Sequence, residues 1–123
     1  MVDQVLRGCR VLVVEDEYLL ADDLSLALSS AGADVLGPVP SIAEATAEIA
    51  AGRRIDLAVL DVNLRGDMVF PVADALVERG IPFAFATGYD SGSLPDRFSA
   101  VPRFEKPFKA SRIAEILVPL IRS

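Results

Sequence analysis

Several residues that could do chemistry stand directly after short apolar runs of the chain. Glu15 and Asp16 follow the first run, and Asp61 follows the third. Thr87 follows the fourth run and Lys106 follows the fifth. Carboxylates held about 4 Å apart repel one another by roughly 4 kcal/mol near a protein surface. Three acids brought to one place therefore need a cation beside them.

The chemistry that this set of groups suits is the acceptance of a phosphoryl group. The chain has no histidine, so oxygen ligands remain, and these favour a hard ion such as Mg²⁺. A carboxylate can attack phosphorus to form an acyl phosphate, and Mg²⁺ neutralises charge on the transferring oxygens. A lysine adds a compact positive charge, and a hydroxyl can donate a hydrogen bond. Taken singly, each residue is typical of a cap, a turn or a solvated charge; their joint placement indicates a site.

These residues meet only if strands and helices alternate, and the apolar pattern predicts that they do. Five βα units favour an α/β, flavodoxin-like fold with a five-stranded parallel sheet of order 2-1-3-4-5. Helices on both faces would make three layers, and the carboxyl ends of the strands would share one rim. The pattern predicts strands at 10–14, 34–39, 55–60, 82–86 and 101–105, and helices over 18–31, from 41 to about 51, along an apolar stripe from Val69 to Val77, and through Ile121.

Three local signals refine these elements. Ser41 with Glu44 three residues later forms a capping box, which predicts the start of the second helix. Pro119 is expected to kink or end the last helix, because it lacks an N–H and crowds a carbonyl. Residues 89–100 contain a glycine and a proline within a poor apolar pattern, which predicts a short or mobile fourth helix.

Composition limits the classes of function. The chain has 123 residues, 52% of them hydrophobic, and a formal net charge of −6. Its twelve Lys and Arg residues are scattered, which argues against nucleic-acid binding, because phosphate backbones require concentrated positive charge. No apolar run approaches the roughly 20 residues that span a bilayer, and no signal peptide is apparent at the start. We expect one cytoplasmic domain over residues 1–123, with no output domain and no membrane partner.

Four segments resemble the signature of receiver domains of two-component response regulators, a family of bacterial signalling proteins. They are Val11–Glu17, Leu57–Leu64, Ala86–Gly88 and Glu105–Phe108, and the resemblance covers essentially the whole chain. It implies that Asp61 is the phosphoacceptor. It also implies a Mg²⁺ site formed by Glu15, Asp16, Asp61 and the backbone carbonyl of Asn63.

The same resemblance implies how the phosphoryl group is held and where it comes from. Thr87 and Lys106 would contact it, and the Lys106–Pro107 peptide would be cis. The donor would be a sensor histidine kinase or a phosphotransfer protein, and the domain would assist its own phosphorylation without being a turnover enzyme. A downstream protein, unknown from the sequence, would bind the face made by the fourth helix, the fifth strand and the fifth helix.

The sequence departs from the family pattern in three places. The acid pair is Glu-Asp, so Glu15 reaches one methylene further and could touch the metal through water. Gly88 follows Thr87 where family members often have alanine. The position three before the lysine, usually an aromatic switch residue, is Arg103, with Phe104 beside it.

A subgroup signature suggests a substitute for that aromatic switch. Residues 85–89 read Phe-Ala-Thr-Gly-Tyr, which is similar to a subgroup of stand-alone receivers associated with bacterial stress or general signalling. Tyr89, two residues past the threonine, could replace the missing aromatic. Alternatively, Tyr89 is a partly exposed loop residue with no signalling role.

Three other functions fit the pattern less well. A haloacid-dehalogenase-type phosphatase would need an acid two residues after the nucleophile, where Asn63 stands. A flavodoxin-like FMN carrier would need a Ser, Thr or Gly loop after the first strand, where residues 15–17 are acidic. An unphosphorylated interaction module would have no use for the complete set of site residues.

Overall fold

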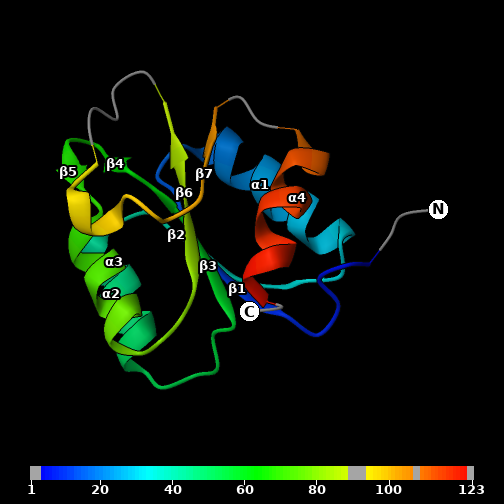
Figure 1. Cartoon of the computed structure of the whole chain (residues 1–123), viewed down its shortest axis with the longest axis horizontal. Coiled ribbons are helices and arrows are strands. Elements are labelled where there is room, and N and C mark those ends of the chain that lie inside the picture. The colour runs from blue at the N-terminus through cyan, green and yellow to red at the C-terminus, as the bar shows by residue number, and fades with distance from the viewer. Residues whose placement is uncertain (1–3, 89–93, 107–108, 122–123) are drawn as a thin grey trace.

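The computed structural model describes residues 4–88, 94–106 and 109–121 (Figure 1). Strands and helices alternate along these ranges, as the sequence predicts. The elements are β1 Arg10–Val14, α1 Tyr18–Ser30, β2 Asp34–Val39, α2 Ile42–Ala50, β3 Leu57–Asp61, β4 Asn63–Leu64, β5 Asp67–Met68, α3 Phe70–Glu78, β6 Phe83–Thr87, the 3₁₀ turn η1 Asp96–Phe98, β7 Arg103–Glu105 and α4 Ala110–Ile121.

The main sheet confirms the predicted flavodoxin-like topology. Its strands are parallel in the order β2-β1-β3-β6-β7, which is the predicted 2-1-3-4-5, because β4 and β5 form a separate hairpin. Val14 pairs with Leu60, and Asp61 pairs with Ala86. Thr87 pairs with Glu105. The register therefore brings the carboxyl ends of β1, β3, β6 and β7 to one edge.

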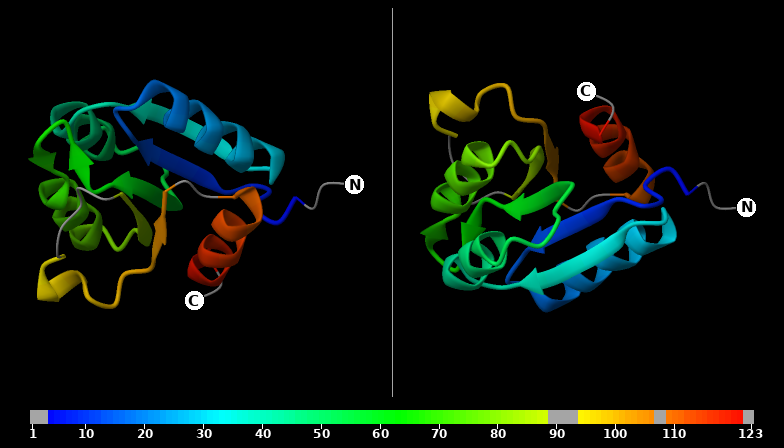
Figure 2. Two further views of the ribbon diagram at one scale, coloured as in Figure 1. Left: turned by 90° about the horizontal axis from the view of Figure 1, so that it is seen from above. Right: turned by 90° about the horizontal axis from the view of Figure 1, so that it is seen from below.

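Helices cover both faces of the sheet and complete the three layers. Figure 1 shows α2 and α3 on one side and α1 and α4 on the other, and the views from above and below show the same arrangement (Figure 2). Alternate residues of a strand face opposite layers: Leu12 belongs to the core under α2 and α3, whereas Val13 belongs to the core under α1 and α4. The central strands are apolar on both faces because both are covered.

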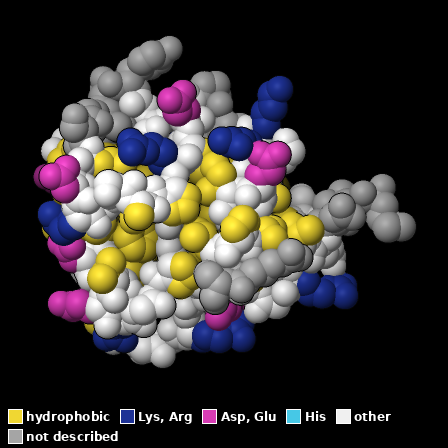
Figure 3. All heavy atoms as spheres, viewed as in Figure 1, with side chains coloured by type: hydrophobic (Ala, Val, Ile, Leu, Met, Phe, Trp, Pro, Cys, Tyr) yellow, Lys and Arg dark blue, Asp and Glu magenta, His cyan; other side chains and the backbone are white. Residues whose placement is uncertain are grey.

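The surface agrees with the scattered charges of the sequence. On the face in Figure 3, basic and acidic side chains are spread among polar and apolar ones, and the basic ones do not gather. Within the described ranges, no helix is long and apolar enough to cross a membrane.

Local signals predicted some element boundaries correctly and missed others. The amide of Glu44 donates to Ser41 Oγ at 3.2 Å, so Ser41 caps α2 as predicted. The Glu44 carboxylate accepts from the Ser41 hydroxyl at 3.0 Å, in place of the backbone N–H that a full capping box uses. The buried stripe of the third helix stops at Leu76, and Val77 is 59% exposed, contrary to prediction. The sequence predicts that Pro119 either kinks or ends the last helix. The helix does not end there but continues to Ile121.

The predicted fourth helix is reduced to the single turn η1 within the described residues. Residues 89–93 lie outside those residues. Phe98 of η1 is buried and stacks at 5.7 Å on the ring of Phe70. Arg97 forms a bidentate ion pair with Asp74 of α3 at 3.0 Å. These contacts attach the segment to the α3 side of the sheet.

The hairpin of β4 and β5 was not predicted. Leu64 pairs with Asp67, so the loop contains only Arg65 and Gly66. Both have positive φ, 55° and 95°, as a type I′ turn requires. The amide of Gly66 donates to Asn63 Oδ1 at 2.6 Å and closes the turn.

The outer strand β2 contains a bulge against β1. Leu12 pairs with Leu36 but Val14 pairs with Val39, so Gly37 and Pro38 together oppose one residue. Gly37 has φ 101°. A Cβ there would lie 2.8 Å from the carbonyl oxygen of Val13, so the bulge requires glycine.

Candidate functional site at the strand ends

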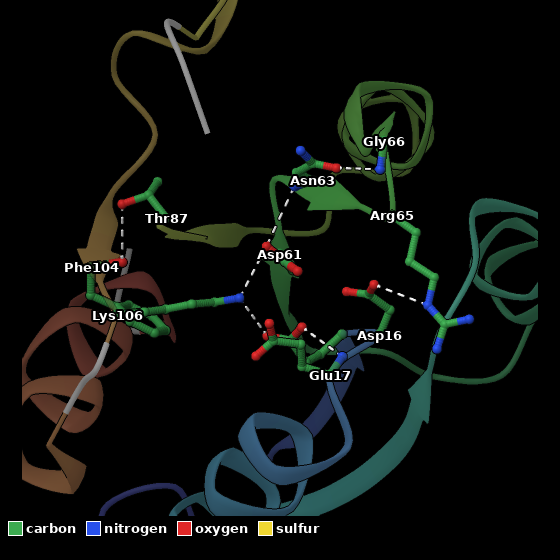
Figure 4. A network of polar contacts seen from close by, with 10 residues as sticks. Asp16, Glu17, Asp61, Asn63, Arg65, Gly66, Thr87, Phe104 and Lys106 are labelled. Atoms are coloured by element: carbon green, nitrogen blue, oxygen red, sulfur yellow. Dashed lines mark hydrogen bonds and ion pairs between the residues drawn. The ribbon is translucent and has the colours of Figure 1, made fainter. Parts of the chain in front are cut away.

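The sheet brings the predicted site residues to one edge, and Figure 4 shows most of them. Glu15 and Asp16 follow β1, and Asp61 ends β3. Thr87 ends β6, and Lys106 follows β7. The amide of Lys106 donates to the carbonyl oxygen of Thr87 at 2.8 Å, which extends the pairing of β6 with β7 and fixes the start of the lysine side chain.

Three carboxylates lie close together at this edge. Glu15, Asp16 and Asp61 each offer one oxygen, and these oxygens lie within 4.8 Å of one another. Glu15 and Asp61 are buried, and the side chain of Asp16 is 9% exposed. Carboxylate oxygens without thiol or imidazole suit a hard divalent ion such as Mg²⁺. The donor set therefore fits that ion.

Lys106 supplies a cation to two of the carboxylates. Its Nζ lies 2.8 Å from Glu15 Oε1 and 3.2 Å from Asp61 Oδ1, and its side chain is 14% exposed. Burial disfavours the charged ammonium, but hydrogen bonds and charge from Glu15 and Asp61 outweigh it and raise the pKa of Lys106. The lysine therefore stays protonated.

Burial lowers the pKa of a lysine, but it raises the pKa of a carboxylic acid such as Asp61. Desolvation, with the hydrogen bond and negative charge of Glu15, raises the pKa of Asp61 to about 8, although Lys106 opposes the shift. A second positive charge beside the carboxylate would lower this pKa. The site thus favours the ionised, nucleophilic form of Asp61 most when a cation is bound.

Asn63 lies beside Asp61. Its amide donates to Asp61 Oδ1 at 3.4 Å, and its own side chain closes the hairpin turn. The role of its backbone carbonyl as a metal ligand stays a prediction.

Thr87 faces the neighbouring strand in this structure. Its Oγ1 donates to the carbonyl oxygen of Phe104 at 3.5 Å, a long contact (Figure 4). Thr87, Gly88, Glu105 and Lys106 line a cavity of about 180 Å³. The threonine therefore borders open space next to the lysine.

The residues singled out for a switch differ in orientation. In β7, Phe104 is buried in the core under α1 and α4, whereas Arg103 is exposed. Alternation along a strand explains the difference, because successive side chains point to opposite faces. Tyr89 and Pro107 lie outside the described residues, so the switch role and the cis peptide stay predictions.

Sequence reasoning missed one charged residue of the site. Arg65, from the hairpin turn, places Nε 3.4 Å from Asp16 Oδ2. The signal for it was the dipeptide Arg65-Gly66 after Asn63, because glycine favours positive φ in a two-residue hairpin turn. The turn could have been predicted from that signal, but not the direction of the arginine.

Comparison with known proteins gives relatives that align over nearly the whole chain. No protein-family model matches. The solution structure of SdrG from Sphingomonas melonis Fr1 is 42% identical, with 92% of this chain and 96% of that chain covered and a TM-score of 0.83. The BeF₃-activated conformation of SdrG from Pseudomonas melonis Fr1 is 40% identical, with 98% and 99% covered and a TM-score of 0.77.

Relatives with lower sequence identity have names that state a role in signalling. A response regulator receiver protein from Sinorhizobium medicae WSM419 is 25% identical, with 96% of this chain and 98% of that chain covered and a TM-score of 0.80. The sensory transduction protein LytT of Bacillus cereus is 33% identical over 112 residues, which are 88% of this chain and 45% of LytT. The chain thus spans less than half the length of the curated relatives that it matches.

Proposed function

This chain belongs to the response-regulator receiver family, and from that premise we propose that Asp61 accepts a phosphoryl group in a Mg²⁺-dependent reaction. The observation that carries the proposal is the placement of Asp61 at the end of β3. There its buried carboxylate lies among Glu15, Asp16 and Lys106. A carboxylate with a fixed ammonium and two further acids beside it has both a nucleophile and a place for a divalent ion.

The residues divide the chemistry among them. One oxygen of Asp61 forms a bond to phosphorus while the bond from phosphorus to the donor breaks, and its electrons leave with the donor group. Lys106, already beside Asp61, stabilises negative charge on the phosphoryl oxygens. Glu15, Asp16, Asp61 and the Asn63 carbonyl would hold Mg²⁺, which supplies charge neutralisation for the transfer.

Thr87 and the cavity beside it give the phosphoryl group a place. The threonine hydroxyl would rotate from the Phe104 carbonyl, whose contact is long at 3.5 Å, to donate to a phosphoryl oxygen. Gly88 and Lys106 line the same cavity. Hydrolysis of the acyl phosphate would return Asp61 to its free form.

The family to which the chain belongs suggests which proteins donate the phosphoryl group and which protein responds to it. We infer that a sensor histidine kinase or a phosphotransfer protein phosphorylates Asp61 and that a downstream protein reads the result. Residues 1–123 would act as one cytoplasmic receiver domain, an acceptor that assists its own phosphorylation rather than an enzyme. The Phe-Ala-Thr-Gly-Tyr sequence and the SdrG relatives favour the stand-alone subgroup, with Tyr89 in place of the switch aromatic.

A labelling experiment tests the proposal directly. The protein would be incubated with acetyl phosphate and Mg²⁺, and phosphorylation would be followed by a phosphate-affinity gel. In parallel, BeF₃⁻, the activating group named for the SdrG relative, would be added with Mg²⁺ while amide resonances are recorded. We expect label and resonance shifts in the wild type and neither in Asp61→Asn.

A matched acid gives the control. Asp22 is exposed on α1, so Asp22→Asn should label like the wild type. Label on Asp61→Asn equal to that of the wild type, or no label on the wild type with Mg²⁺ present, would overturn the proposal. In the second case the chain would be an interaction module that is not phosphorylated.

A further inference from the structure

We propose that Arg65 is a tethered cation that neutralises Asp16 in the metal-free protein and is displaced when Mg²⁺ binds. Arg65 would thereby lower the affinity of the site for the metal. This inference rests on the proposed function, because it concerns the same Mg²⁺ site. It assigns a role to a residue of the hairpin rather than to the strand ends.

The contacts show that every acid of the cluster has a cation of the chain beside it. Arg65 Nε lies 3.4 Å from Asp16 Oδ2. Lys106 contacts the other two acids, Glu15 and Asp61. Figure 4 shows that Lys106 and Arg65 approach from opposite sides. A divalent ion bound by the three carboxylates would therefore compete with these cations for the negative charge of the cluster.

The hairpin holds Arg65 in a position to make this contact. Among the described residues, Arg65 is the one non-glycine residue with positive φ. Its turn is closed by the 2.6 Å bond from the Gly66 amide to Asn63 Oδ1. Leu64, the residue before Arg65, is buried and anchors the hairpin in the core. The backbone of Arg65 is thus fixed, and only its side chain has to move.

The two cations differ in how easily they can leave. Lys106 is 14% exposed and has contacts of 2.8 and 3.2 Å to two acids. Arg65 is 81% exposed, and its ion pair within the described residues is a 3.4 Å contact with Asp16, an acid that is 9% exposed. Displaced from Asp16, the guanidinium returns to water at small cost, because an exposed cation remains hydrated. Asp16 is therefore the acid that exchanges its partner for the metal.

The size of the effect follows from the exposure of the arginine. Ion pairs with an exposed partner are weak, so removing Arg65 should lower the dissociation constant for Mg²⁺ by about two- to fivefold at low ionic strength. Salt screens exposed charges, with a Debye length of about 10 Å at 0.1 M and roughly 3 Å at 1 M. The difference between the proteins should therefore shrink as salt is added.

The test is a Mg²⁺ titration by calorimetry and by amide resonances on the whole chain. Wild type would be compared with Arg65→Gln, which removes the charge, and with Arg65→Lys, which keeps it. Arg97→Gln is the matched control, because Arg97 pairs with Asp74 between η1 and α3. We expect tighter binding in Arg65→Gln alone, and equal constants in the other three proteins.

The outcomes separate this inference from the proposed function. Equal constants for wild type and Arg65→Gln, or weaker binding by Arg65→Gln, would overturn the role of Arg65 and leave the metal site standing. Tighter binding in Arg97→Gln as well would reduce the effect to net charge and also overturn it. Absence of binding in all four proteins would overturn the Mg²⁺ site, and this inference with it.

Discussion

At the scale of single residues, Glu15, the acid that departs from the family pattern, already has a partner for each of its carboxylate oxygens. From the sequence, Glu15 belongs to the metal site and could touch the metal through water. In the structure its Oε1 pairs with Lys106 at 2.8 Å, and its Oε2 accepts a hydrogen bond from the amide of Glu17 at 3.1 Å. The extra methylene thus lets Glu15 span from the start of α1 to the lysine after β7. After desolvation, its hydrogen bond and negative charge are the causes that raise the pKa of Asp61.

That raised pKa gives the metal-free protein a characteristic pH dependence. Asp61 has a pKa of about 8 in the folded chain, against 3.8 as the ordinary value. Between those values the folded state keeps a proton that the unfolded state has lost, so the contribution of Asp61 to stability is full below about pH 4 and is lost as the pH rises through about 8. In EDTA, the free energy of unfolding of wild type relative to Asp61→Asn should fall over this window.

Denaturant unfolding from pH 5 to 9 measures this difference. Subtracting the Asp61→Asn values removes the titration of the groups that do not contact Asp61, and adding Mg²⁺ should flatten the curve, because the ion favours the ionised carboxylate. A difference that stays constant from pH 5 to 9 in EDTA would contradict the prediction, because it would show that the pKa of Asp61 lies at or below its ordinary value of 3.8, as for a carboxylate dominated by Lys106.

Sequence reasoning could assign the strand-end residues because topology alone brings them together. Glu15, Asp61 and Lys106 each follow a parallel strand, and parallel strands end at one edge. Arg65 could not be assigned this way. Its contact with Asp16 depends on a two-residue turn outside the main sheet and on a side-chain direction, neither of which follows from apolar periodicity.

At the scale of elements, η1 shows how a segment with weak helical signals is held. Its ring, Phe98, contacts the rings of Phe70, Phe83 and Phe85 at 5.6 to 6.2 Å between centroids. These rings come from α3 and β6, so one side chain joins three elements. Periodicity could not predict this, because a single buried aromatic has no period.

Phe98 should therefore contribute much more to the free energy of unfolding than the shortness of η1 suggests. Phe98→Ala leaves a cavity among three rings, and we expect a loss of about 3–5 kcal/mol in the free energy of unfolding. Phe98→Leu should lose less, because it fills part of the space. Urea unfolding measures both. Arg97→Gln removes an exposed ion pair with Asp74 and the guanidinium that lies 4.5 Å from the centre of the Phe98 ring. It should lose about 2 kcal/mol or less, and a similar loss in Phe98→Ala would contradict the packing role.

At the scale of the whole molecule, the order and layers of the sheet could be predicted from the alternation of runs, but its irregular edge could not. The bulge at Gly37 depends on two residues of β2 opposing one of β1. A glycine in a strand pattern is a weak signal for such a bulge. What fixes it is a close approach to Val13, which is known only from the packed structure.

Two glycines with positive φ allow that close approach to be measured. Gly37→Ala would place a Cβ 2.8 Å from the Val13 carbonyl oxygen, whereas a Cβ at Gly52 would meet nothing within 4 Å. Both variants have the cost of a left-handed residue, about 1–2 kcal/mol. Gly37→Ala should lose more than Gly52→Ala in thermal and urea unfolding. Equal losses would mean that β2 shifts away from β1 without cost.

The same bulge bears on how copies of the protein behave at high concentration. β2 is an outer strand of the sheet, and outer strands can recruit another chain through their unpaired backbone groups. Pro38 has no N–H to donate, and the bulge with Gly37 breaks the regular spacing that an added strand would need. The opposite outer strand, β7, has only three residues. Both sides of the sheet are thus poor templates for strand addition, which protects the protein from aggregating edge to edge.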